Sequence, residues 1–164
     1  ASFKMGIALL YTLRGIPSIY YGTEILMKNY SDPDAKVRED FPGGWNGDKN
    51  NAFPASGRTE VQKQYFDFTA KLLNWRKNKS VIHAGKTTHY IPENNVYVYF
   101  RYNEKETVMV IINNNPEKQT IKTNRFLENI KNYTSGKDVL GNASFDLKNE
   151  ISIEGKSALI LELR

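Results

Sequence analysis

Cysteine is absent from this 164-residue chain, and histidine occurs only twice, as His83 and His89. Without thiols the chain cannot form disulfides, use a cysteine nucleophile or build a cysteine-based zinc site. Neither histidine has an aspartate or glutamate at ligand spacing, so we expect no metal site and no histidine-based acid–base catalysis. No apolar run approaches the roughly 18 residues that a membrane-spanning helix needs. What remains for chemistry is a set of carboxylate, guanidinium, amide and aromatic side chains.

Positive charge exceeds negative charge only modestly, since 23 lysines and arginines accompany 18 aspartates and glutamates. Acidic residues interleave with the basic ones, as in the segments 38–40 and 104–106. A nucleic-acid-binding protein usually concentrates its basic residues in one patch or on one helix face. The longest basic cluster, at 76–79, ends a predicted helix, where cations favour the helix dipole. We therefore expect neither a nucleic-acid partner nor a membrane span.

The N-terminal half predicts a helix, a buried strand, a long loop and a second helix. Apolar residues at helical spacing favour a helix over 2–13, with Gly15 as a left-handed cap. The continuous apolar run Ile16–Tyr21 is typical of a strand buried on both faces, with Tyr20 and Tyr21 on opposite sides. Residues 29–58 are rich in turn formers, which predicts a loop of about thirty residues and suggests ligand contacts there.

A capping box at Thr59 and Gln62 predicts the start of the second helix, which should run to about Asn78. One apolar stripe follows along it, formed by Val61, Tyr65, Phe68, Leu72 and Trp75. This stripe predicts that one face of the helix is buried.

After Ser80 the hydrophobic period changes from about 3.6 to about 2. Two runs of β-branched and aromatic residues, Val96–Tyr102 and Thr107–Ile112, predict a hairpin. Further strands are predicted at Lys86–Ile91, Gln119–Thr123, Lys137–Leu140, Glu150–Ile153 and Ala158–Leu163. Short strands with this spacing favour an antiparallel sandwich.

The stretch Leu13–Glu24, LRGIPSIYYGTE, resembles the eighth barrel strand of the alpha-amylase family, glycoside hydrolase family thirteen. Ile25–Met27 and the segment Arg38–Trp45, REDFPGGW, look most similar to bacterial neopullulanases and cyclomaltodextrinases. The order of strand, long loop, helix and C-terminal sandwich also matches. The resemblance implies that residues 1–80 are the last strand, substrate loop and helix of a (β/α)8 barrel. Residues 81–164 would then form a Greek-key sandwich of the amylase domain C type.

The resemblance implies a parent enzyme, a retaining hydrolase that cleaves α-1,4-glucans such as maltooligosaccharides, pullulan or cyclodextrins. Retaining hydrolases need two carboxyl groups roughly 5–5.5 Å apart, and in this family they precede the matched region. Glu24 follows a strand end but would be a supporting residue. We expect no catalytic residue in this chain, which would serve to complete the barrel.

The expected partners are an α-glucan oligosaccharide and the N-terminal barrel of the same polypeptide, and a homo-oligomer remains an open alternative. We expect no cofactor in this chain, while calcium remains open for the parent enzyme. The abundance of asparagine and the variant at 40–45 resemble bacterial starch-utilisation enzymes, which implies a periplasmic or secreted location.

The long loop holds the candidate substrate-binding residues Asp32, Asp34, Arg38 and Trp45. In many family members an Asp-Pro-x-x-Arg segment here binds a glucose unit. Asp32 precedes Pro33, whereas Asp34 has the spacing to Arg38, so the two aspartates compete for the role. Carboxylate and guanidinium groups suit sugar hydroxyls because charge-assisted hydrogen bonds are short and strong. The alternative is an exposed salt bridge.

Aromatic residues offer two further hypotheses. Trp45 and Phe41 could present an aromatic face to a pyranose ring, or both could anchor the loop against the barrel. A rival function is a non-catalytic carbohydrate-binding sandwich, whose binding platform would be formed by Tyr90, Tyr97, Tyr99 and Tyr102.

Overall fold

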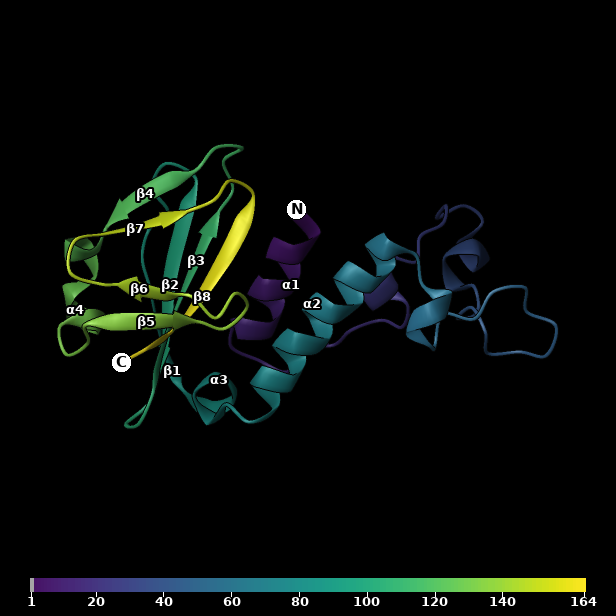
Figure 1. Ribbon diagram of the computed structural model, residues 1–164, viewed down its shortest axis with the longest axis horizontal. Helices are drawn as coiled ribbons and strands as arrows, with labels where there is room; N and C mark the ends of the chain where they lie inside the picture. Colours follow the sequence, from purple (N-terminus) through teal and green to yellow (C-terminus); the bar gives the residue numbers. More distant parts are fainter. Residues whose placement is uncertain (1) are drawn as a thin grey trace. The chain divides into compact units, whose positions relative to one another are not determined.

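The computed structural model describes residues 2–164, which form two compact units (Figure 1). One unit comprises residues 18–70, and the other comprises residues 2–17 with 71–164. The domain boundary predicted near residue 80 stays a prediction. Among the residues described, no helix has both the length and the apolar character required to cross a bilayer.

Two long helices confirm the predicted ones, α1 (Ser2–Thr12) and α2 (Glu60–Lys77). The capping box opens α2 as expected, because the Gln62 backbone N–H donates to Thr59 Oγ1 at 3.2 Å and the Thr59 N–H donates to Gln62 Oε1 at 2.9 Å. The shorter α-helices are α3 (Ser80–Ala84) and α4 (Leu127–Ile130). The 3-10 helices are η1 (Thr23–Ile25), η2 (Asp34–Arg38), η3 (Ala55–Gly57) and η4 (Thr123–Phe126).

The C-terminal region is an antiparallel β-sandwich, which confirms the predicted fold class. The larger sheet has the order β1-β2-β3-β8-β5-β6, and the smaller one pairs β4 with β7. The strands are β1 (Lys86–His89), β2 (Val96–Tyr102), β3 (Thr107–Asn113), β4 (Gln119–Lys122), β5 (Ser135–Asp138), β6 (Ser144–Asp146), β7 (Glu150–Ile153) and β8 (Ser157–Leu163).

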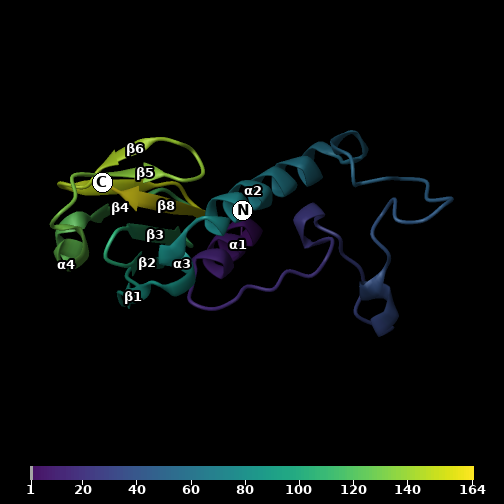
Figure 2. The ribbon, with the colours of Figure 1, turned by 90° about the horizontal axis from the view of Figure 1, so that it is seen from below.

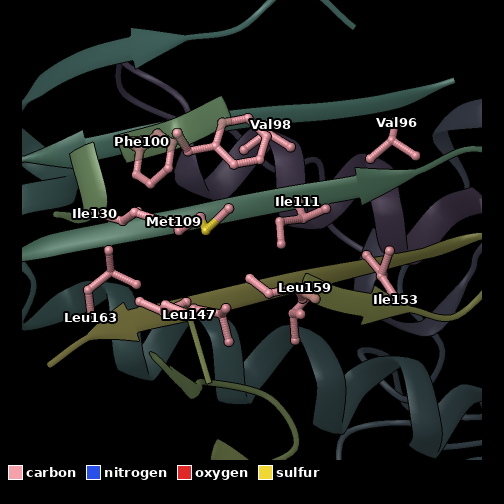
Figure 3. Packing of buried hydrophobic residues seen from close by; sticks show 13 residues of the cluster. Val96, Val98, Phe100, Met109, Ile111, Ile130, Leu147, Ile153, Leu159 and Leu163 are labelled. Atoms are coloured by element: carbon pink, nitrogen blue, oxygen red, sulfur yellow. The ribbon is translucent and has the colours of Figure 1, made fainter. Parts of the chain in front are cut away.

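The sandwich core lies between the two sheets (Figure 3). Alternate residues of β2, β3 and β8 point into it, as the period of two requires. Helices η4 and α4, which the sequence analysis missed, add Phe126 and Ile130. Full burial of a large apolar side chain stabilises the fold by about 1.5–3 kcal/mol.

Helix α1 covers the opposite face of the larger sheet, against β3 and β8 (Figures 1 and 2). Met5, Ile7, Ala8 and Tyr11 are its buried apolar residues. At its C-terminal end, the hydroxyls of Thr12 and Tyr99 are 2.5 Å apart. Burial raises the pKa of Tyr99, so this hydroxyl stays protonated.

A polar cluster fastens the C-terminal end of α2 to the sheet. Lys79 Nζ lies 2.8 Å from carboxylate oxygens of both Glu106 and Glu162. Trp75 Nε1 donates to the same Glu162 oxygen at 2.6 Å. Burial by itself would raise the pKa of Glu162, but the hydrogen bonds from Lys79 and Trp75 outweigh it and lower that pKa. Nearby, the fully buried Arg101 donates to the backbone carbonyl of Ile82 at 2.8 Å.

The strand predicted over Ile16–Tyr21 does not form, and this prediction was wrong. Ile16 is 99% exposed, and among residues 2–164 no strand pairs with this segment. A strand buried on both faces needs neighbours that satisfy its backbone groups, and an apolar run alone cannot supply them. Tyr20 and Tyr21 also do not point apart, because their ring centroids lie 4.5 Å from each other.

Candidate functional site

The loop predicted at 29–58 contains little regular structure beyond η2 and η3. Its middle is closed by the Ala52 N–H, which donates to the carbonyl of Pro42 at 2.9 Å. Phe41 packs on Phe53 with ring centroids 4.6 Å apart. This ring contact joins two parts of the same loop.

A tight turn carries Trp45. One carboxylate oxygen of Asp48 accepts hydrogen bonds from the backbone N–H groups of Gly43, at 2.8 Å, and Trp45, at 3.1 Å. Gly43 has φ +99°, and a Cβ there would lie 2.3 Å from the Asn51 side chain. The turn therefore requires glycine at this position. It leaves Trp45 66% exposed.

Arg58 ties the end of the loop to α2, a role that the sequence analysis missed. Its guanidinium donates to the carbonyls of Ala52, at 2.8 Å, and Phe53, at 2.6 Å. The same group lies over the Phe66 ring at 3.5 Å. The only available signal was an arginine directly before the capping box, which does not reveal carbonyl partners five and six residues upstream.

Asp34 and Arg38 form an ion pair on η2. Arg38 Nη2 lies 2.6 Å from Asp34 Oδ2, and both side chains are about two-thirds exposed at 65% and 68%. The two residues are the first and the last of this 3-10 helix. Asp32 is exposed and shows no ion pair within residues 2–164. The structure thus brings Arg38 together with Asp34.

A small cavity of about 190 Å³ lies beside η2. Tyr20, Tyr21, Lys36 and Val37 contribute to its wall. The Tyr21 hydroxyl donates to the carbonyl of Glu39 at 2.9 Å, which fixes one side. The Asp34–Arg38 pair does not line this cavity. Sugar binding by the pair stays a prediction.

The four tyrosines proposed as a platform do not share a surface, and this hypothesis was wrong. Tyr97 and Tyr99 stack at 5.2 Å on the face that α1 covers, where Tyr99 is fully buried. Tyr90 and Tyr102 pack against the sandwich core. Period-two alternation separates the two pairs, and the α1 contact that buries Tyr99 is long-range.

No group of three or more histidine, aspartate or glutamate residues is placed to hold a metal ion within residues 2–164. Glu24, the supporting residue suggested by the resemblance, lies half-buried in η1.

Comparison of the sequence and the fold with known proteins identifies the family of the chain. Residues 87–162 match the family described as the cyclo-malto-dextrinase C-terminal domain. Neopullulanase 2 of Thermoactinomyces vulgaris is 28% identical over 123 residues, which cover 74% of this chain and 18% of that protein. The chain belongs to the alpha-amylase family. It matches the C-terminal region of that family, and not a catalytic region.

Other alpha-amylase family members agree. A cyclomaltodextrin glucanotransferase of Geobacillus stearothermophilus is 33% identical over 66% of this chain and 13% of its own length. An alpha-amylase from Geobacillus thermoleovorans, crystallised with acarbose, has the same fold with a TM-score of 0.74 and 23% identity. That match covers 99% of this chain and 33% of the amylase. The chain therefore spans only a small part of the relatives that it matches.

Proposed function

We propose that the chain is the C-terminal part of a retaining glycoside hydrolase that acts on α-1,4-glucans, namely maltooligosaccharides, pullulan or cyclodextrins. The observation that carries the proposal is the match of residues 87–162 to the cyclo-malto-dextrinase C-terminal domain. In this proposal the chain completes a catalytic barrel and presents one substrate-contacting loop. The catalytic carboxylates belong to the barrel, so the chain has no hydrolytic activity alone.

The Asp34–Arg38 pair supports a role in binding glucan. Only one oxygen of Asp34 and one nitrogen of Arg38 are engaged in the ion pair. The remaining carboxylate oxygen accepts hydrogen bonds, and the remaining guanidinium N–H groups donate them. Neighbouring hydroxyls of one sugar ring can supply both partners. Because Asp34 already orients Arg38, we assign the binding role to Asp34 and not to Asp32.

Exposed apolar side chains support a barrel as the partner. Ile16, Tyr20, Tyr30, Phe53 and Val61 are each more than half exposed. A neighbouring part of a larger protein would remove such side chains from water, which is favourable. In the proposed enzyme, the remaining repeats of the barrel cover these groups.

The test uses the native, longer polypeptide. We expect Asp34→Ala and Arg38→Ala each to lower kcat/KM on maltoheptaose by about 10- to 100-fold, because a hydrogen bond to a charged group contributes about 1.5–3 kcal/mol. Asp32→Ala should have a smaller effect. Asp67→Ala, which removes an exposed carboxylate on α2, is the matched control. If the first two variants behave like the control, the loop does not bind substrate. Absence of any glucan hydrolysis by the unmodified polypeptide would refute the proposed activity.

A further inference from the structure

The sandwich contains a pocket of about 310 Å³ between β2, β4 and η4. Its volume lies at the lower end of the range for small-molecule sites, about 300–1,000 Å³. It has an apolar floor formed by Val96, Val98, Ile121 and Phe126. Three of these side chains are almost fully buried, and Ile121 is half-buried. Ile121 is therefore the floor residue that presents the most apolar surface to the C–H face of a ligand.

Three amide side chains surround this floor, those of Asn94, Gln119 and Asn124. None of these side-chain amides hydrogen-bonds to another group of residues 2–164, so all three are available to a ligand. An amide carries both donors and an acceptor. Such groups suit a molecule whose hydroxyls both donate and accept, as those of a sugar do.

The free edge of β4 adds backbone groups to the same wall. The Thr123 N–H donates to Asn149 at 2.9 Å, and Ile121 is paired with Ile151. In an antiparallel ladder, alternate residues face away from the partner strand. The N–H and C=O groups of Thr120 and Lys122 therefore point to the open edge, and both residues line the pocket.

The charges around the pocket favour a neutral ligand. Arg125 forms an ion pair with Glu93 at 3.0 Å and donates to the carbonyl of Ile91 at 2.7 Å. Lys122 is then the one remaining charged side chain on the wall. A single, already paired carboxylate does not make a divalent cation site, and one lysine is a poor match for a phosphate group.

We infer that this pocket is a saccharide-binding site that takes a neutral maltooligosaccharide, on residues different from those of the Asp34–Arg38 loop. The choice of an α-glucan rests on the proposed function, whereas the preference for a neutral polyhydroxyl ligand rests on the pocket itself. The site has an apolar floor, available amides and a compensated charge pair, and it contributes binding without chemistry.

The experiment is a titration of the ¹⁵N-labelled chain 1–164 with maltotriose, followed by two-dimensional ¹H–¹⁵N NMR. We expect saturable shifts of the side-chain NH₂ signals of Asn94, Gln119 and Asn124. The exposed Asn132, away from the pocket, should not shift. The double variant Gln119→Ala/Asn124→Ala should raise the Kd about tenfold or more, because two hydrogen bonds are lost. Asn132→Ala is the matched control and should leave the Kd unchanged.

Unshifted backbone signals in β2 and β3 of the unliganded double variant would show that the sandwich is intact. The inference is overturned if maltotriose shifts only the Trp45 loop, if it shifts nothing, or if inorganic phosphate displaces it from the pocket. If the pocket amide signals do not shift while the native polypeptide hydrolyses glucan, this inference alone is overturned. Shifted pocket amides without any hydrolysis would overturn the proposed activity and leave the pocket as a binding site.

Discussion

Glu162 is the residue through which the end of α2 is most directly fastened to the sandwich, and Glu162→Gln tests that attachment. The substitution removes the charge that Lys79 contacts at 2.8 Å and weakens the 2.6 Å hydrogen bond from Trp75. The Lys79 and Glu162 side chains are 21% and 25% exposed. Exposed ion pairs contribute about 0.2–1 kcal/mol, whereas breaking a buried pair costs about 3–5 kcal/mol. Because this pair is half-buried, we expect Glu162→Gln to lower the free energy of unfolding by an intermediate amount, about 1.5–2.5 kcal/mol.

The assay is urea unfolding monitored by tryptophan fluorescence in a Trp45→Phe background, so that Trp75 is the reporter. In thermal unfolding of a chain of this size, the same loss in the free energy of unfolding corresponds to a fall in Tm of about 4–8 °C. Glu154→Gln is the matched control, since its pair with Lys118 is 74% exposed on the glutamate side and should change stability by less than about 0.5 kcal/mol.

The pH dependence has a definite sign. The pKa of Glu162 is lowered on folding, so its contribution is present above the unfolded pKa of about 4.3 and is lost as the pH falls through the lower folded value. The difference in the free energy of unfolding between the parent and Glu162→Gln should have its full value at pH 7 and should disappear in acid. The pKa of Lys79 is raised, because the hydrogen bonds to Glu106 and Glu162 outweigh its burial, so its contribution disappears only in strong alkali. Equal stabilities at pH 7, or a gap that persists unchanged near pH 3, would refute this account.

Two further substitutions test single buried groups. Asn113 is fully buried and its Nδ2 donates to three backbone carbonyls, at 3.0, 3.3 and 3.0 Å. Asn113→Asp places a carboxylate against these oxygens and should lower the free energy of unfolding by about 3 kcal/mol or more, with the exposed Asn132→Asp as control. A loss below about 1 kcal/mol in urea titration would contradict the assigned donors. Tyr99→Phe removes the hydroxyl that contacts Thr12 and should cost about 1 kcal/mol, read from Tm in calorimetry. An unchanged Tm would mean that α1 is held by apolar contacts alone.

Local patterns predicted the local structures. The capping box at Thr59 and the β2–β3 hairpin need only neighbouring residues, and both form as predicted. Asp34 and Arg38 pair at the two ends of the 3-10 helix η2, which the predicted loop over 29–58 did not include. Helices η4 and α4 were not predicted because a segment of eight residues is too short to show a hydrophobic period. The role of Arg58 was not predicted because its hydrogen-bond acceptors are backbone carbonyls, which every residue has.

The amino-acid sequence by itself determined the family, the two long helices, the β2–β3 hairpin and the alternation that separates the two faces of β2, because these depend on residue identity and spacing. Tertiary structure decided what buries each of those faces, the sandwich core on one side and helix α1 on the other. Helix α1 covers Tyr99, and the α2 terminus meets Glu162 across 87 residues of sequence. It also decided that Ile16–Tyr21 remains outside any sheet, since a strand depends on hydrogen bonds from neighbours that an apolar run cannot specify. The pocket beside β4 has the same origin, because its floor and its amides come from three elements that only the folded chain brings together.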